Sequence, residues 1–246
     1  MTRTAAWVLG GLAAGLAGAA AGTLVAFRAS REERQRAMPG DALVRDPMYA
    51  TTQAVTIDAP PSVVWPWLAQ MGAGRGGWYS YDQIDNGGAP SARVLLPECQ
   101  HVAPGDVFPA LPGARDAFIV ARAERPCDLV LTAPGGDDTT IVSWEFQLVP
   151  AALDRTRLIV RARVADGWRA AAAAPRRHPG GSFFIERVYA VLARLPTPLL
   201  LAVAGLAHRA MENQQLRGIR RRAERRGRAT SRPALAADAP GARHDG

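Results

Sequence analysis

Two stretches in the second half of the chain alternate apolar and polar side chains with a period of two residues. The stretches 140–148 and 156–164 carry apolar residues such as Trp144 and Leu158 at even-numbered positions, with mostly polar residues between them. Because neighbouring side chains of a strand point to opposite faces, this alternation predicts two strands with one buried face each. Pro150 to Arg155 supplies the turn between them, so we expect an antiparallel pair. Such a pair needs a further layer to cover its apolar face.

Three further stretches, 51–57, 117–122 and 129–132, also predict strands. The connections after residue 117 are short, which favours an antiparallel meander. Asp58 can cap a helix that has Pro60 and Pro61 in its first turn and runs to about Met71.

The last part of the chain predicts a long helix, which Thr197 caps and which runs to about Arg226. Leu199 to Ala207 is apolar on every side, so protein or lipid must bury it. A curved antiparallel sheet wrapped around this C-terminal helix is the economical solution, and it gives an α+β fold. The remainder, 227–246, is rich in small and turn-forming residues, and we expect it to be a disordered tail.

The chain begins with an apolar segment, because Ala5 to Phe27 contains no charged residue. As a helix it is long enough to cross ~30 Å of hydrocarbon. Small residues between Ala17 and Ala21 leave a cleaved signal peptide as the alternative. Arginines follow the segment at positions 28, 31, 34 and 36, and this positive flank favours a retained helix whose C-terminal side is cytoplasmic. Two G-x-x-x-G spacings could pair this helix into a homodimer.

These features divide the chain into four parts. We expect a transmembrane anchor at 1–28, a juxtamembrane linker at 29–48, a folded domain at 49–226 and the tail at 227–246. The protein would then be a single-pass protein of the inner cell membrane with a cytoplasmic domain.

The formal net charge of +8 is carried by the two ends of the chain. Residues 176–228 contain twelve arginines against three acidic residues, whereas 46–175 contain more acidic residues than arginines. A nucleic-acid-binding domain would place its positive excess on the folded body. Arginines that flank apolar segments suit an anionic membrane surface instead, so we expect a membrane and no nucleic acid as partner.

Three motifs resemble the START-like superfamily, also called SRPBCC, and in particular its uncharacterised bacterial members. They are VVWPWLAQMGAGRGGWYSYDQIDN from Val63 to Asn86, PECQHVAPGDVFP at 97–109 and LRGIRRRAE at 216–224. This superfamily includes polyketide cyclase/dehydrase and lipid-transport proteins. The resemblance implies a helix-grip fold with a cavity between the sheet and the C-terminal helix. It implies no single activity, because its members are carriers, cyclases, hydrolases and regulators.

The aromatic run after the first helix carries the ligand-site prediction. Large rigid rings and a few polar groups are what a pocket for an apolar ligand needs. Core packing is the alternative for Trp78 and Tyr81. The residues that we expect to contact a ligand are Trp78, Tyr79, Tyr81, Asp82, Asn86, Glu98, Gln100 and Trp144.

The sequence supports no metal, cofactor or catalytic assignment. The four histidines lack metal-ligand spacing, and no nucleophile lies in a recognisable motif with a base. We therefore expect a membrane-anchored binding module, a carrier or sensor, for a lipid or other hydrophobic small molecule. An aromatase/cyclase-like enzyme that acts on a hydrophobic substrate in the same cavity is the alternative. A structural partner of other membrane proteins is a third hypothesis.

Overall fold

The computed structural model describes residues 27–112, 117–135, 139–152, 154–173 and 191–237, with side chains up to residue 229. Nearly all of the predicted anchor, residues 1–26, lies outside this range. Within the described residues, no helix is both long and apolar enough to span a membrane.

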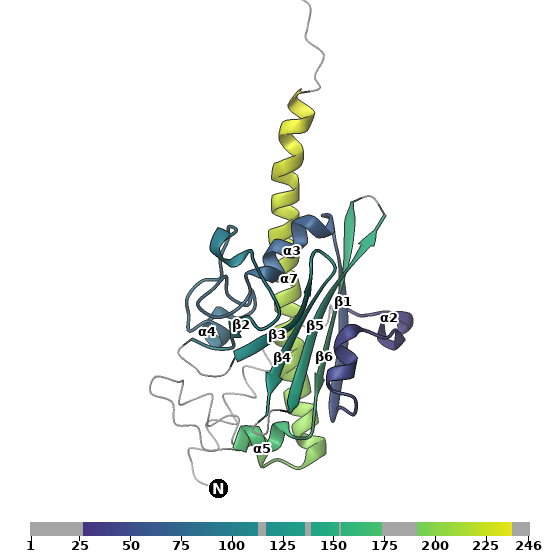
Figure 1. Cartoon of the computed structure of the whole chain (residues 1–246), viewed down its shortest axis with the longest axis vertical. Coiled ribbons are helices and arrows are strands. Elements are labelled where there is room, and N and C mark those ends of the chain that lie inside the picture. The colour runs from purple at the N-terminus through teal and green to yellow at the C-terminus, as the bar shows by residue number, and fades with distance from the viewer. Residues whose placement is uncertain (1–26, 113–116, 136–138, 153, 174–190, 238–246) are drawn as a thin grey trace, which may run out of the picture.

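Six strands form one antiparallel sheet in the order β1-β6-β5-β4-β3-β2 (Figure 1). They are β1 (Tyr49–Ile57), β2 (Val107–Pro109), β3 (Ala117–Glu124), β4 (Asp128–Pro134), β5 (Thr140–Ala151) and β6 (Arg155–Val164). The predicted meander is confirmed as β3 to β6. The first strand joins it at the far side of β6, and the three-residue strand β2 was not predicted because it is too short to show a period.

Helices lie on both faces of this sheet. They are α2 (Arg31–Gln35), α3 (Pro61–Ala69), α4 (Asp82–Asp85), α5 (Trp168–Ala173) and the long α7 (Thr197–Ala237), with 3-10 turns η1 (Pro39–Leu43) and η2 (Pro97–Cys99). Of these, α3 and α7 lie on one face and α2 on the other (Figure 1). Figure 1 shows α7 running along the sheet and continuing beyond it. The predicted α+β arrangement, a curved antiparallel sheet around a long C-terminal helix, is confirmed.

The core lies between α3, α7 and the face of the sheet that we call the inner face. From α7 it receives Leu216, Ile219 and Ala223, which pack with residues such as Leu158 and Val160 of β6. The even-numbered residues of β5 and β6 therefore face inward, as the period-two pattern predicted. A continuous apolar face of this kind is the main source of stability for the helix.

Two predicted details of the helices differ from the structure. Pro60, not Asp58, is the N-cap of α3, because the Asp58 carboxylate pairs with Arg155 at 2.7 Å instead. The last helix continues past Arg226 to Ala237, so the first part of the predicted disordered tail is helical. The arginines and alanines of this segment are strong helix formers, and they extend the helix despite the turn-forming residues among them.

The outer face of the sheet holds the segment that follows the predicted anchor. Arg157 pairs with Glu33 at 2.7 Å, and Arg163 donates to the carbonyl of Val44 at 2.7 Å. Ala29 and Met38 are buried against β1 and β6. The residues expected as a juxtamembrane linker, 29–48, therefore pack on the folded body through the odd-numbered arginines of β6. The side chains of Arg157, Arg161 and Arg163 are therefore engaged by this segment.

Candidate functional site

A buried carboxylate lies where α7 crosses the inner face of the sheet. The side chain of Glu212 has no exposed surface, and Gln53 of β1 donates a hydrogen bond to its Oε2. The same oxygen lies 3.7 Å from Nε2 of His208, one helical turn earlier on α7. His208 is a neighbour on the same helix, whereas the fold brings Gln53 to Glu212 from 159 positions away.

The electrostatic balance at Glu212 favours its protonated form. Burial raises the pKa of this carboxyl, while His208, the Gln53 amide, the Trp144 indole N–H and Arg209 act to lower it. A carboxyl group that holds a proton inside an apolar site can both donate and accept a hydrogen bond.

Tyr49 of β1 completes the polar side of this site. Its ring meets His208 edge-on with the centroids 6.0 Å apart. Burial raises the pKa of the Tyr49 hydroxyl, and Arg209 and Thr51 act to lower it. The ring passes close to α7 because position 205 is glycine, where an added Cβ would lie 3.1 Å from the tyrosine Cε2.

Aromatic rings form the apolar side of the site. Trp144 of β5 stacks on Trp78, with centroids 5.4 Å apart and an interplanar angle of 27°. Phe118 of β3 contacts both rings, and the ring centroid of Phe146 lies 4.9 Å from that of Trp144. Trp144 and Phe118 are half-buried, unlike the fully buried Phe146. Apolar rings with free surface therefore lie beside the buried carboxylate.

Several polar atoms of α7 near this site lack a partner among the described residues. They are Glu212 Oε1, His208 Nε2, Asn213 Oδ1 and Gln215 Oε1. A buried polar atom without a hydrogen bond is costly, so such atoms are usually met by water or by a bound group. We define the grip site as Tyr49, Gln53, Trp144, His208 and Glu212.

The structure brings together two of the predicted ligand-contact residues, Trp78 and Trp144. Trp78 is also held by its indole N–H, which donates to the carbonyl of Ala110 at 3.1 Å. It is nearly buried, so it supports Trp144 more than it offers a surface of its own.

The rest of the predicted aromatic run holds α7 in place. Tyr79 adopts a φ of 62°, its ring lies under the Arg222 guanidinium at 4.4 Å, and burial raises the pKa of its hydroxyl. Ser80 donates to the carbonyl of Met211 at 3.1 Å. Tyr81 is the N-cap of α4 and is half-buried. This run therefore clamps α7, so much of the motif serves to hold the helix in place rather than to contact a ligand.

Most of the side chains predicted to make polar contacts with a ligand form hydrogen bonds within loops instead, and all of them lie outside the grip site. Asp82 accepts from the backbone N–H of Ser91 at 3.0 Å and from its hydroxyl at 2.5 Å. Asn86 donates to the carbonyl of Ala89 at 2.6 Å. Gln100 donates to Gln70 at 3.1 Å and to Leu96 at 3.1 Å, and Glu98 is exposed on η2.

Sequence reasoning missed the polar half of the grip site. Glu212 and His208 are four residues apart, a spacing that places them on one helix side. Glu212 is also the sole acid between Thr197 and Arg222. A lone acid on a helix whose inner side is apolar was the available signal.

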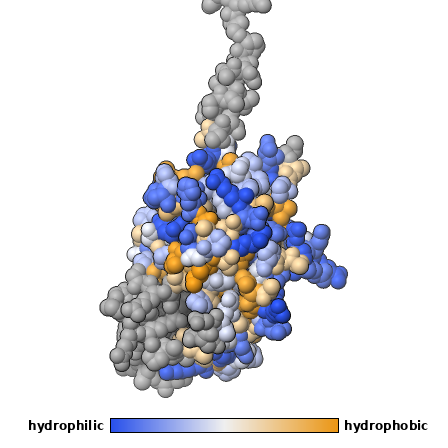
Figure 2. Space-filling model, viewed as in Figure 1, coloured by the Kyte–Doolittle hydropathy of each residue, from blue (hydrophilic) through white to orange (hydrophobic). Residues whose placement is uncertain are grey.

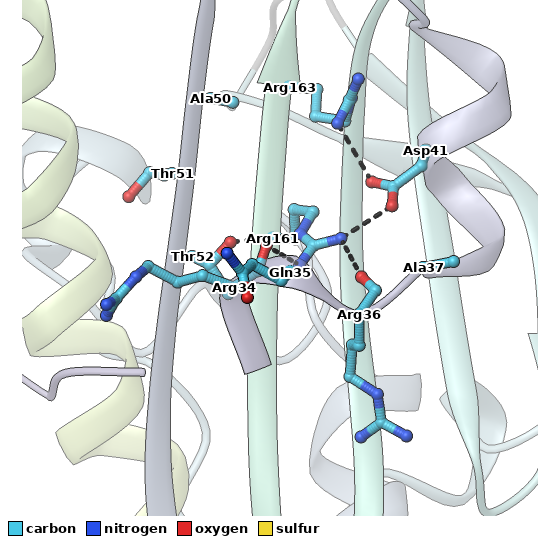
Figure 3. A pocket seen from close by; sticks show the side chains of 10 residues that line it. All are labelled: Arg34, Gln35, Arg36, Ala37, Asp41, Ala50, Thr51, Thr52, Arg161 and Arg163. Atoms are coloured by element: carbon cyan, nitrogen blue, oxygen red, sulfur yellow. Dashed lines mark hydrogen bonds and ion pairs between the residues drawn. The ribbon is translucent and has the colours of Figure 1, made fainter. Parts of the chain in front are cut away.

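A second feature is an open depression of about 500 Å³ on the outer face, beside β1 (Figure 3). Three of its four arginines, Arg34, Arg161 and Arg163, donate hydrogen bonds to other groups of the protein. The Arg161 guanidinium donates to Thr52, to Asp41 at 2.7 Å and to the carbonyls of Glu33, Arg34 and Arg36. Figure 3 shows the Arg34 and Arg36 side chains pointing away from Asp41. This depression fastens the N-terminal segment and offers a ligand little.

Within the described ranges, no three His, Cys, Asp or Glu side chains converge as metal ligands would. The grip site places the half-buried ring of Trp144, which Phe118 contacts, beside the polar side chains of Glu212 and His208.

No protein-family model and no curated protein matches the sequence. Several solved structures resemble this chain at low sequence identity. Among solved structures, the Zhui aromatase/cyclase from Streptomyces sp. R1128 is 16% identical with a TM-score of 0.40, covering 74% of this chain and 97% of that one. A START superfamily protein from Mycobacterium smegmatis is 15% identical with a TM-score of 0.35, covering 74% and 98%.

A third solved structure is the Polyketide_cyc-like protein Cgl2372 from Corynebacterium glutamicum. It is 16% identical with a TM-score of 0.34, covering 73% of this chain and 93% of that one. Similarity at this level concerns fold shape and carries no information about activity.

Proposed function

We propose that this protein binds a hydrophobic small molecule between α7 and the inner face of the sheet. The observation that carries the proposal is the buried Glu212 carboxyl, with one oxygen unpaired among the described residues, beside the half-buried ring of Trp144. An apolar body would lie on Trp144 and Phe118, and a hydroxyl or amine would donate to Glu212. Few polar groups in an apolar surround are typical of sites that orient such ligands.

The test compares two fluorescent probes of the same shape, 1-aminoanthracene and anthracene, on the full chain. The amine can donate to Glu212, whereas anthracene has no donor. The double variant Gln53→Met, Glu212→Met removes the acceptor together with the amide that pairs with it. We expect it to weaken 1-aminoanthracene binding by about tenfold, the worth of one buried hydrogen bond, and to leave anthracene binding nearly unchanged.

Glu145→Gln is the matched control, because it neutralises a buried carboxyl on the outer face of the strand that carries Trp144. It should bind both probes as the wild type does. If neither probe binds the wild type, or if the double variant treats both probes alike, the grip site is not the binding site. Native mass spectrometry of protein purified with its membrane would then identify any natural ligand.

A second candidate function is catalysis on the bound molecule, and the pairing of Glu212 with His208 favours it. A buried carboxyl with a raised pKa and an imidazole 3.7 Å away are a plausible acid and base for proton transfer. Chemical change of a compound retained from the membrane, lost in Glu212→Gln, would support this function. Return of the compound unaltered by the wild type would support binding alone.

We also propose that residues 1–28 anchor the protein in the inner cell membrane, with the domain in the cytoplasm as a carrier or sensor. The support is the charge-free stretch Ala5 to Phe27 and the arginines that follow it. A C-terminal phosphatase reporter, active in the periplasm alone, should stay silent. A bright signal, or a mature protein that begins near Gly22, would overturn this topology.

A further inference from the structure

The C-terminal half of α7 carries a row of arginines on the side opposite its buried residues. They recur every three or four positions, which keeps them on one helix side over about 16 Å. We name this row the arginine stripe; its members are Arg217, Arg221, Arg225 and Arg228. The last three are exposed, where α7 leaves the body of the protein (Figure 1). Figure 2 shows hydrophilic residues gathered around this part of the molecule.

The three exposed members of the stripe are not paired with acidic side chains of the described residues. Within the described part of the chain, no carboxylate pairs with Arg221, Arg225 or Arg228. The nearest acid on the helix, Glu224, accepts from Arg220 at 2.7 Å and from the backbone N–H of Asp58 at 3.2 Å, so it is already engaged.

More positive charge lies beside the stripe. Burial lowers the pKa of Arg222, and repulsion from Arg225 and Arg93 lowers it further. Like charges held this close on a rigid helix destabilise one another unless an anionic surface covers them.

The stripe also lies next to the end of the predicted anchor. The Arg217 guanidinium is 5.9 Å from the ring centroid of Phe27, the last residue of the apolar stretch. Phe27 is fixed there, because its carbonyl accepts from the backbone N–H of Ala54 on β1 at 3.2 Å. The last residue of the predicted anchor and the first residue of the arginine stripe therefore lie side by side.

We propose that the arginine stripe docks on the surface of an anionic phospholipid bilayer. Guanidinium groups pair with phosphate through parallel hydrogen bonds, and a straight helix side fits a planar surface. Proximity to Phe27 favours a bilayer over a nucleic acid as the partner. The docked helix would hold the domain against the membrane at a fixed orientation. This inference goes beyond ligand binding at the grip site and does not depend on it.

Hydrogen exchange of the full chain with excess lipid nanodiscs tests the proposal. One set of nanodiscs contains phosphatidylcholine alone, and the other also contains phosphatidylglycerol. We expect the amides of residues 221–229 to exchange about fivefold more slowly with the anionic nanodiscs, because each arginine adds attraction to the charged surface. The difference should vanish in about 0.5 M salt, where screening is strong. Amides of β5 should exchange alike in both sets.

Two triple variants with equal loss of charge separate the stripe from net charge. Arg221→Gln, Arg225→Gln, Arg228→Gln should lose the lipid-dependent protection. Arg45→Gln, Arg125→Gln, Arg194→Gln, which alters exposed arginines elsewhere, should keep it. Equal exchange in the two lipid sets, or equal protection in both triple variants, would overturn the proposal. Protection by added RNA with neutral nanodiscs, but not by phosphatidylglycerol, would overturn it in favour of a nucleic-acid partner.

Discussion

Gln53 on β1 and Glu212 on α7 are joined by a hydrogen bond across the interior of the protein. Both residues are buried, with 6% and 2% of their surface exposed. Around them the contact between helix and sheet is made by side chains such as Val55 and Leu216. This polar link therefore sets how α7 is placed along β1, while the apolar contacts supply most of the stabilisation.

The first prediction concerns this pair. Gln53→Met alone leaves a buried carboxyl without its donor, and we expect it to lower the free energy of unfolding by about 2–3 kcal/mol. The double variant Gln53→Met, Glu212→Met removes both partners and should lie within about 1 kcal/mol of the wild type. Urea denaturation measures the stability of these two variants and of the single variant Glu212→Met. A double variant as unstable as the sum of the two single variants would show that the residues do not interact.

The second prediction is a pH dependence set by Glu145, which lies on the outer face and accepts from the backbone N–H of Gly40 at 2.7 Å. Burial raises its pKa to about 7, with further increases from Asp128 and Asp41 and opposing effects from Gly40 and Arg161. Because the unfolded pKa is near 4.5, the folded state holds the proton more tightly. The free energy of unfolding should therefore fall as the pH rises from about 4.5 through about 7.

Glu145→Gln stays neutral and should lose this part of the pH dependence. From pH 5 to pH 8, the free energy of unfolding of the variant should rise by about 1–3 kcal/mol relative to that of the wild type. Burial also raises the pKa of Asp85, to about 7, and that of Glu212, so a part of the decline with pH remains in the variant. Denaturant unfolding at the two pH values gives the comparison, and identical pH profiles of the two proteins would contradict the assignment.

The third prediction uses two glycines of α7 that differ in what surrounds them. A Cβ at Gly218 would overlap the carbonyl oxygen of Tyr79 and lie 2.7 Å from its Cβ, whereas one at Gly227 would lie 3.5 Å from the Cβ of Ala59. Gly218→Ala should destabilise the protein by about 2–3 kcal/mol. Gly227→Ala should be neutral or stabilise it by up to about 1 kcal/mol, since alanine favours helix. Thermal melts decide this, and similar effects at both positions would refute the clamp between Tyr79 and α7.

The sequence predicted most of the fold because its elements carry local signals. The alternation in β5 and β6 follows from one buried face, and most of α7 up to about Arg226 follows from a stretch rich in helix-forming residues. The three residues of β2 and the true N-cap of α3 were beyond reach, because each depends on a partner distant in the chain. Asp58 resembles a cap in sequence, yet Arg155, the first residue of β6, pairs with its carboxylate.

The sequence predicted the aromatic part of the grip site but not its polar part. Trp144 was identified from its aromatic character, but Glu212 and Gln53 are 159 positions apart and neither belongs to a motif. The aromatic run from Trp78 to Tyr81 attracted the site prediction, since a dense motif can mark a binding loop. In the structure, much of this aromatic run packs against α7. The backbone of Tyr79 lies so close to Gly218 that an added Cβ would overlap the Tyr79 carbonyl oxygen, so the run has to stay in place opposite the helix.

The last prediction concerns Arg161, which fastens the N-terminal segment to the outer face of the sheet. Its side chain is 6% exposed and pairs with Asp41, and it also meets three backbone carbonyls of the segment. Arg161→Met removes the donor that these part-buried carbonyls share and one of the partners of Asp41, so we expect a loss of about 3–5 kcal/mol in the free energy of unfolding. Arg155→Met breaks the exposed pair with Asp58 and should cost less than about 1 kcal/mol. Hydrogen exchange should accelerate in residues 31–43 of the Arg161 variant before the sheet opens. If those amides exchange as in the wild type, the segment is held by Ala29 and Met38 rather than by the arginine.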